Sequence, residues 1–171
     1  MHFACHPVDS SFFDTAPMRF KNAVELAARP VDVFAIFEDG ESWPRWFDGI
    51  HKVAWTSNKP CGVGTTRTVW LTPATVDERF FRWEPGHRFS FYVTRQSMPL
   101  FHALAEDYLL EELAPGETRF TYSVAIEPRL ALRIGGPVAR TRLDSVFRNA
   151  CRGLQSYVLK AGTSPRAGES P

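Results

Sequence analysis

Apolar and polar residues alternate along most of the chain, which is the pattern of strands that bury one face. The pattern begins at 19–26, where Phe20, Val24 and Leu26 share one side. Similar strand patterns follow over 50–56, 65–71, 74–83, 88–93, 102–113 and 118–126. Turns rich in glycine and proline separate most of them, such as the one at 84–87. The sequence therefore predicts seven strands, joined mainly by hairpins.

Two segments replace this alternation with helical spacing. Pro30 opens an apolar stretch, 30–37, and proline suits the first turn of a helix. Near the C-terminus apolar residues recur every three or four positions, at Leu143, Val146, Phe147, Ala150, Cys151, Leu154 and Val158. This spacing predicts a terminal helix of about five turns. Between the helices, the segment 41–49 holds two tryptophans around a proline, and we expect it to cover one end of the core.

The chain of 171 residues has the length of one domain. We predict an N-terminal arm over 1–18, a single folded domain over 19–160, and a disordered tail over 161–171, which is rich in Gly, Ser and Pro. No run of 18 apolar residues occurs, so stable insertion into a membrane is not expected. Whether the protein is a monomer or a homodimer stays open.

Charge and cysteine usage exclude several classes of function. Twenty basic and nineteen acidic residues leave a net charge of +1, so no field attracts nucleic acid. Cys5, Cys61 and Cys151 are scattered, which suggests free thiols in a reducing, cytoplasmic compartment. Cys5 could join His2 and His6 around a metal, but a fourth ligand of suitable spacing is missing. We expect no metal or other cofactor.

Four motifs, in one order along the chain, carry a resemblance to a known family. They are 28–37 together with Trp43-Pro-Arg-Trp46, then Gly62-Val-Gly-Thr65, then 78–85, and finally 111–118 before the closing helix. The chain resembles the START-like superfamily, also called SRPBCC or helix-grip, and within it the polyketide cyclase/dehydrase and lipid-transport group. The resemblance implies an α+β, Bet v 1-like fold. In that fold a seven-stranded bent antiparallel sheet wraps around a long C-terminal helix and encloses a cavity for lipids, polyketides or other apolar molecules.

Aromatic side chains supply the candidate walls of such a cavity, because they make up 13% of the chain. Tyr108 and Tyr122 are expected on adjacent strands, where their phenols would orient a polar group of a ligand. The alternative is that these rings pack as a solid core. The predicted ligand-binding residues are Trp70, Phe81, Phe91, Tyr108, Phe120 and Tyr122 on strands, Trp46, Phe47 and Phe101 on covering loops, and Phe147 and Cys151 on the helix.

Ionisable residues on the strands are the candidates for acid/base chemistry: Arg67, Glu78, His102 and Asp107. Alternation leaves open which of the four face the interior. The two glycines at Gly62 and Gly64 fit a hairpin turn, since no phosphate-binding helix follows them. No serine lies in a Gly-x-Ser-x-Gly setting, so hydrolase chemistry is not expected.

Three classes of function follow from these residues. The first is a non-catalytic binder or carrier of a hydrophobic small molecule, with no catalytic residue. The second is an enzyme, a polyketide cyclase, aromatase or dehydratase, that uses Tyr122, His102 or Arg67 as donors or bases. The third is a regulator that binds a protein partner and keeps only a vestigial cavity. An interior with room for a ligand would favour the first two, and product formation would separate them.

Overall fold

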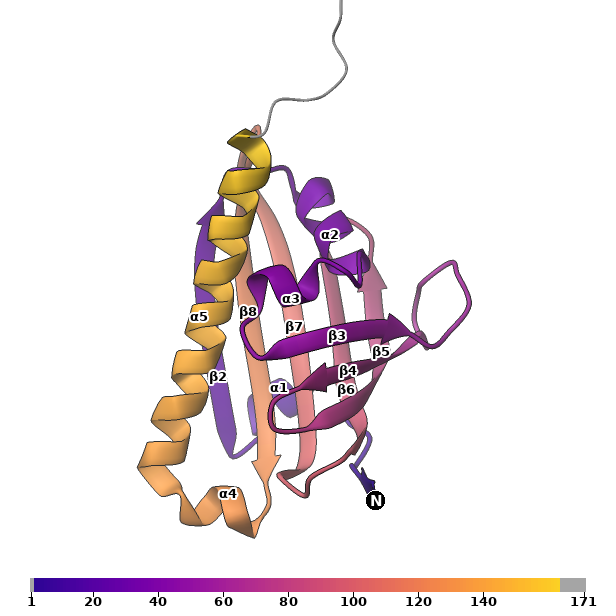
Figure 1. The fold of residues 1–171 in the computed structure, drawn as a ribbon, viewed down its shortest axis with the longest axis vertical. Coiled ribbons are helices and arrows are strands. Elements are labelled where there is room, and N and C mark those ends of the chain that lie inside the picture. The colour runs from indigo at the N-terminus through magenta and orange to yellow at the C-terminus, as the bar shows by residue number, and fades with distance from the viewer. Residues whose placement is uncertain (1, 164–171) are drawn as a thin grey trace, which may run out of the picture.

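One curved antiparallel sheet forms the body of the protein, in a computed structural model that describes residues 2–163. Its seven long strands run in the order β2-β8-β7-β6-β5-β4-β3 (Figure 1). Their bounds are β2 Met18–Leu26, β3 Ile50–Trp55, β4 Thr66–Leu71, β5 Thr75–Glu84, β6 Arg88–Gln96, β7 Phe101–Ala114 and β8 Glu117–Pro128. The predicted seven strands are confirmed, because each apolar alternation falls on one of them.

Helix α5, Gly136–Thr163, lies along the sheet beside β2 and β8, and α2, Pro30–Glu38, and α3, Trp43–Trp46, cover the upper end of the concave face (Figure 1). This arrangement confirms the predicted α+β helix-grip architecture. Within the described residues no helix is both long enough and apolar enough to cross a bilayer.

Two features of the C-terminal region differ from the prediction. A short helix, α4, Leu130–Ile134, precedes α5, and α5 has 28 residues, more than the five turns that its apolar stripe indicates. The first turns of α5 expose Val138 and Arg140, so they carry no apolar stripe that sequence could detect. The helix also continues to Thr163, past the expected start of the tail, and residues 164–171 lie outside the described part of the chain.

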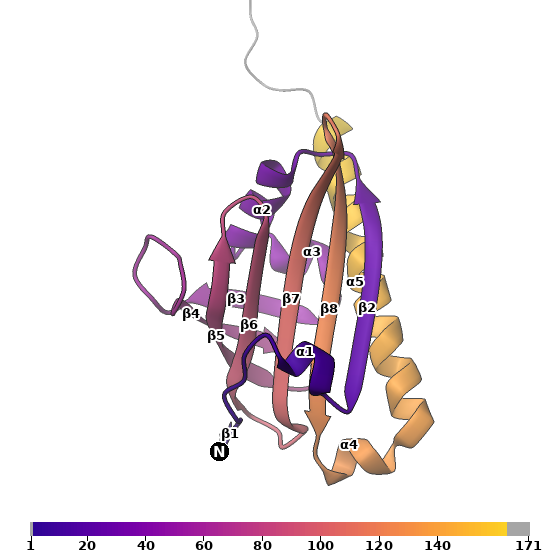
Figure 2. The same ribbon diagram turned by 180° about the vertical axis from the view of Figure 1, so that it is seen from behind.

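The N-terminal arm crosses the convex face of the sheet (Figure 2). Its strand β1, Phe3–Ala4, pairs with Arg95 and Gln96 at the end of β6. Its helix α1, Phe12–Thr15, brings Phe13 to 6.5 Å, between ring centroids, from a phenylalanine of β5. The arm therefore shields part of the face that points away from α5.

Close contact between α5 and α3 depends on a glycine. A methyl group on Gly153 would lie 2.0 Å from the carbonyl oxygen of Trp46. Although alanine favours helix by about 1 kcal/mol over glycine, we expect Gly153→Ala to lower the free energy of unfolding by roughly 1–3 kcal/mol, because backbone must move. The matched control is Gly162→Ala near the end of α5, where, apart from the adjacent backbone of the helix, no atom of residues 2–163 lies within 4 Å of the added methyl group. Urea unfolding of both variants checks this, and equal effects would contradict it.

Candidate functional site

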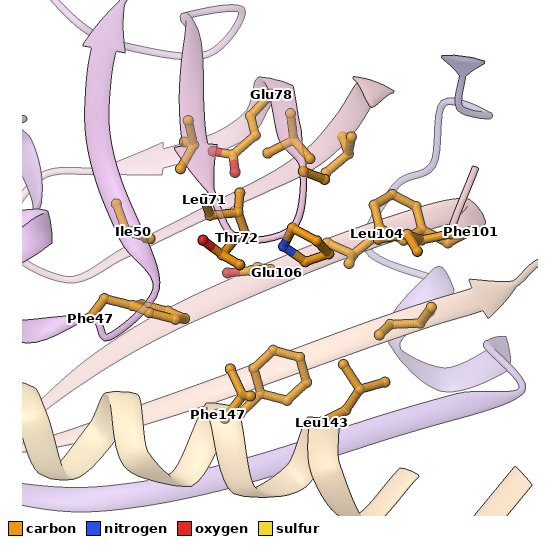
Figure 3. A pocket seen from close by; sticks show the side chains of 18 of the residues that line it. Phe47, Ile50, Leu71, Thr72, Glu78, Phe101, Leu104, Glu106, Leu143 and Phe147 are labelled. Carbon is orange, nitrogen blue, oxygen red and sulfur yellow. The ribbon is translucent and has the colours of Figure 1, made fainter. Parts of the chain in front are cut away.

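A cavity of about 260 Å³ lies between the concave face of the sheet and α5. Most of its wall is apolar, with Phe47, Leu104 and Phe147 among the side chains drawn in Figure 3. Val146 of α5 lines the cavity and is 45% exposed, so it stands at the entrance. The polar side chains of the lining are few: Arg67, Thr72, Glu78, Glu106 and Tyr108. The cavity thus has an apolar body and a small set of polar groups, as ligand sites usually have.

Glu106 of β7 is the central polar group of the cavity wall. Its Oε2 accepts hydrogen bonds from the hydroxyls of Tyr108, at 3.0 Å, and Tyr122, at 2.8 Å. The two tyrosines are register partners on β7 and β8, as the sequence predicted. Burial, and then the nearby charge of Glu78, raise the pKa of Glu106 to about 7, against the two phenol hydrogen bonds. This carboxyl group therefore changes charge near neutral pH.

Both phenols near Glu106 stay protonated at neutral pH. Burial raises the pKa of Tyr108 and of Tyr122 well above the usual value for tyrosine, and the adjacent carboxyl group adds to the rise. Each hydroxyl can therefore only donate its proton to Glu106 while that group is ionised. The result is a carboxyl group held in one orientation by two donors.

Arg67 and Glu78 form a buried ion pair beside this carboxyl group. The distance from Nε of Arg67 to Oε2 of Glu78 is 2.5 Å, and Arg67 is only 2% exposed. The guanidinium group lies 4.3 Å from the ring centroid of Trp43 and 4.7 Å from that of Phe91. Burial raises the pKa of Glu78, and the charge of Arg67 opposes that rise. Sheet and α3 together hold this charge pair in place.

Residues 17–159 match the family described as polyketide cyclase / dehydrase and lipid transport. The chain belongs to this family. Among curated proteins it is similar to an uncharacterized protein of Mycobacterium tuberculosis, 38% identical over 162 residues, which are 91% of this chain and 93% of that protein.

Solved structures of other proteins share the fold. One is a START superfamily protein from Mycobacterium smegmatis, with a TM-score of 0.72 and 14% identity, covering 84% of this chain and 98% of that one. Another is the Zhui aromatase/cyclase from a Streptomyces species, with a TM-score of 0.69 and 15% identity, covering 89% of this chain and 99% of that one. At such identities the likeness concerns the fold alone.

Of the eleven residues that the sequence predicts for the site, four line the cavity: Phe47, Phe101, Tyr108 and Phe147. Five others are buried but lie behind the lining, namely Trp46, Phe91, Phe120, Tyr122 and Cys151. Tyr122 still reaches the site, because its hydroxyl bonds to Glu106. The two alternatives of cavity and solid core thus both occur, side by side.

The prediction that Trp70 and Phe81 face the interior is wrong. Trp70 is 36% exposed, and Nζ of Lys52 lies 5.1 Å from its ring centroid. Phe81 lies on the convex face, near Phe13 of the arm. Each of them follows a buried apolar residue, Val69 before Trp70 and Phe80 before Phe81. Because two successive residues are apolar, the alternation on these strands does not show which of the two faces the interior.

Of the four ionisable candidates, two line the cavity and two lie outside it. Arg67 and Glu78 line the cavity, as described above. Asp107 lies on the convex face, where Arg88 holds it with two hydrogen bonds. His102 stacks on His6 at 5.7 Å between ring centroids, outside the cavity lining, so its suggested role as a base in the cavity is wrong.

Sequence reasoning missed Glu106, although a signal for it exists. The residue stands between Leu104 and Tyr108 in the alternation of β7, where the residues facing the cavity are otherwise apolar or aromatic. A carboxyl group at an inward position of a strand is rarely buried without a partner, so such a residue is a candidate for a functional site. Among the residues described, no group of three His, Cys, Asp or Glu side chains is placed to bind a metal.

Proposed function

We propose that this protein binds and carries a hydrophobic small molecule in the cavity between the sheet and α5. The observation that carries the proposal is the cavity of about 260 Å³, apolar over most of its wall, with its polar groups gathered around Glu106. Ligand pockets commonly span about 300–1,000 Å³, so a cavity of this size suits a compact molecule of one or two rings. A core that served stability alone would be expected to pack without such a space.

A blocked entrance tests the proposal. Val146→Trp places a large ring at the mouth of the cavity, and Val138→Trp makes the same change on α5 at a residue that does not line it. We expect the first variant to lose at least about tenfold in affinity for apolar two-ring probes, a cost of ~1.4 kcal/mol, while the second binds like the wild type. Thermal shift and fluorescence titration measure both. Equal binding by the two variants would contradict the proposal.

Acid/base catalysis on a bound polyketide is the second candidate, and one observation favours it. Glu106 faces the cavity with its pKa near 7, a value suited to proton transfer at neutral pH. In its ionised form it can remove a proton from carbon or oxygen of a bound molecule, and in its protonated form it can return one to a leaving hydroxyl. Cyclisation and dehydration of a polyketide need these two steps.

Product formation separates the two candidates. Purified protein is incubated with a panel of aromatic polyketide precursors and lipids, while thermal shift follows binding and mass spectrometry follows products. If the protein is an enzyme, Glu106→Gln should lower turnover by at least about a hundredfold and leave binding in place, since a neutral amide cannot exchange protons. Binding without turnover across the panel supports the carrier. Turnover that survives the substitution would overturn the role of Glu106.

A further inference from the structure

The two carboxyl groups of the cavity are only partly used by the protein. Glu78 accepts a hydrogen bond from Arg67 at Oε2, and Glu106 accepts both phenol hydrogen bonds at Oε2. Across residues 2–163, four buried polar side-chain atoms have no hydrogen-bond partner: Asn22 Nδ2, Trp46 Nε1, Arg67 Nη1 and Arg82 Nη1. The hydrogen bonds of Glu78 and Glu106 among the described residues all end on Oε2, and Oε1 of neither residue is among these buried unpartnered atoms, so both Oε1 atoms are accessible in the cavity that the two residues line. Two acceptor oxygens therefore face a bound molecule.

The titratable groups around Glu106 come from four strands. Arg67 lies on β4, Glu78 on β5, Tyr108 on β7 itself and Tyr122 on β8. The side chains that α4 and α5 contribute to the lining are apolar: Leu132, Leu143, Val146 and Phe147. Because Arg67 is paired with Glu78, its charge is already matched, and ionisation of Glu106 adds one net negative charge to this end. A ligand anion would meet no accessible cation there, because Arg67 is paired with Glu78 and its unpartnered Nη1 is itself buried.

We propose that the polar end of the cavity selects ligands with an uncharged hydroxyl head group and rejects those with a carboxylate. This rests on the proposed function and names its ligand class. A hydroxyl can donate to the free oxygen of Glu106 or Glu78, so the buried polar groups of both molecules are satisfied. A carboxylate has no proton to donate and is repelled by the carboxyl groups over a short distance in an apolar site. Fatty acids and other apolar acids therefore bind more weakly than alcohols of the same shape.

Three two-ring probes with one shape test the selection: naphthalene, 2-naphthol and 2-naphthoate. At about pH 8, we expect wild-type protein to bind 2-naphthol at least roughly tenfold more tightly than 2-naphthoate, with naphthalene between them. Between about pH 6 and pH 8 the affinity for 2-naphthoate should fall about tenfold, because the anion needs Glu106 protonated and that fraction shrinks. The affinity for naphthalene should stay constant. Isothermal titration calorimetry measures all three.

Glu106→Gln is the matched variant, since the amide keeps the shape and removes the charge. We expect it to bind 2-naphthoate without the pH dependence and to keep its affinity for naphthalene. Equal affinities of wild type for the alcohol and the acid at about pH 8 would overturn the selection and leave the proposed function standing, because binding itself persists. Failure of all three probes to bind would overturn both. Tighter binding of 2-naphthylmethylammonium than of 2-naphthol would contradict the proposal that the cavity prefers an uncharged head group.

Discussion

Replacing Arg67 by methionine should lower the free energy of unfolding by about 3–5 kcal/mol, because it leaves the carboxyl group of Glu78 buried without its counter-ion. For a chain of 171 residues this corresponds to a fall in Tm of roughly 6–20 °C. Methionine fills similar space among the rings, so the lost charge is the main change. Urea unfolding at neutral pH measures the loss.

The stability lost in Arg67→Met should depend on pH and be smaller at low pH. In the folded wild type burial already raises the pKa of Glu78, and removal of Arg67 takes away the main effect that opposes the rise. A carboxyl group with a folded pKa above its unfolded value favours the fold at low pH and loses that contribution as pH rises. The deficit of Arg67→Met should therefore shrink toward about pH 4.5.

A double variant shows whether the buried charge is the cause. Arg67→Met combined with Glu78→Met replaces the pair by apolar groups of similar volume, which is often nearly neutral for stability. We expect it to regain at least half of the lost free energy. Equal stability of the single and double variants at neutral pH would show that Arg67 acts by packing alone.

Replacing Phe37 by alanine should cost about 3–5 kcal/mol of unfolding free energy. Phe37 of α2 is 1% exposed, and its ring lies 5.3 Å from that of Tyr108 and 5.4 Å from that of Phe120, between centroids. It also contacts both tryptophans of α3. One ring thus joins α2, α3 and the sheet, and its loss leaves a void that none of the three can close without moving.

Phe81→Ala is the control for this prediction, because it removes the same kind of ring from the opposite, convex face of the sheet. Phe81 is half-buried and has fewer partners, so we expect a loss of no more than about 1–2 kcal/mol. Guanidinium unfolding followed by circular dichroism compares the two variants. A larger effect of Phe81→Ala would contradict the assignment of the two faces.

The fold could be predicted from the sequence because its signals are local. Alternation fixes the strands, Pro30 marks the start of α2, and the stripe from Leu143 to Val158 marks the buried side of α5. The short helix α4 and the first turns of α5 escaped detection because they bury little. Pairing of β1 with β6 also has no local signal, since a strand of two residues is too short for alternation.

The site could be predicted only in part, because its polar groups break the rule that served the fold. Arg67 and Glu78 occupy inward positions where alternation expects apolar residues, and they are tolerated there because they pair across neighbouring strands. Trp70 shows the converse, an aromatic ring on the outer face. The side that a residue faces is decided by strand register, which the chain reveals only after folding.

The order of strands leaves β2 and β3 at the two edges of the sheet, and this affects how copies of the protein associate. The free edge of a strand is a template for joining a strand from another chain, which is how many β-rich proteins aggregate. Here Arg19, Lys21 and Glu25 project from β2 and Lys52 from β3, all of them exposed. Such charges would lose their hydration in a continuous sheet. These exposed charges therefore disfavour pairing of either end strand with a strand of another chain.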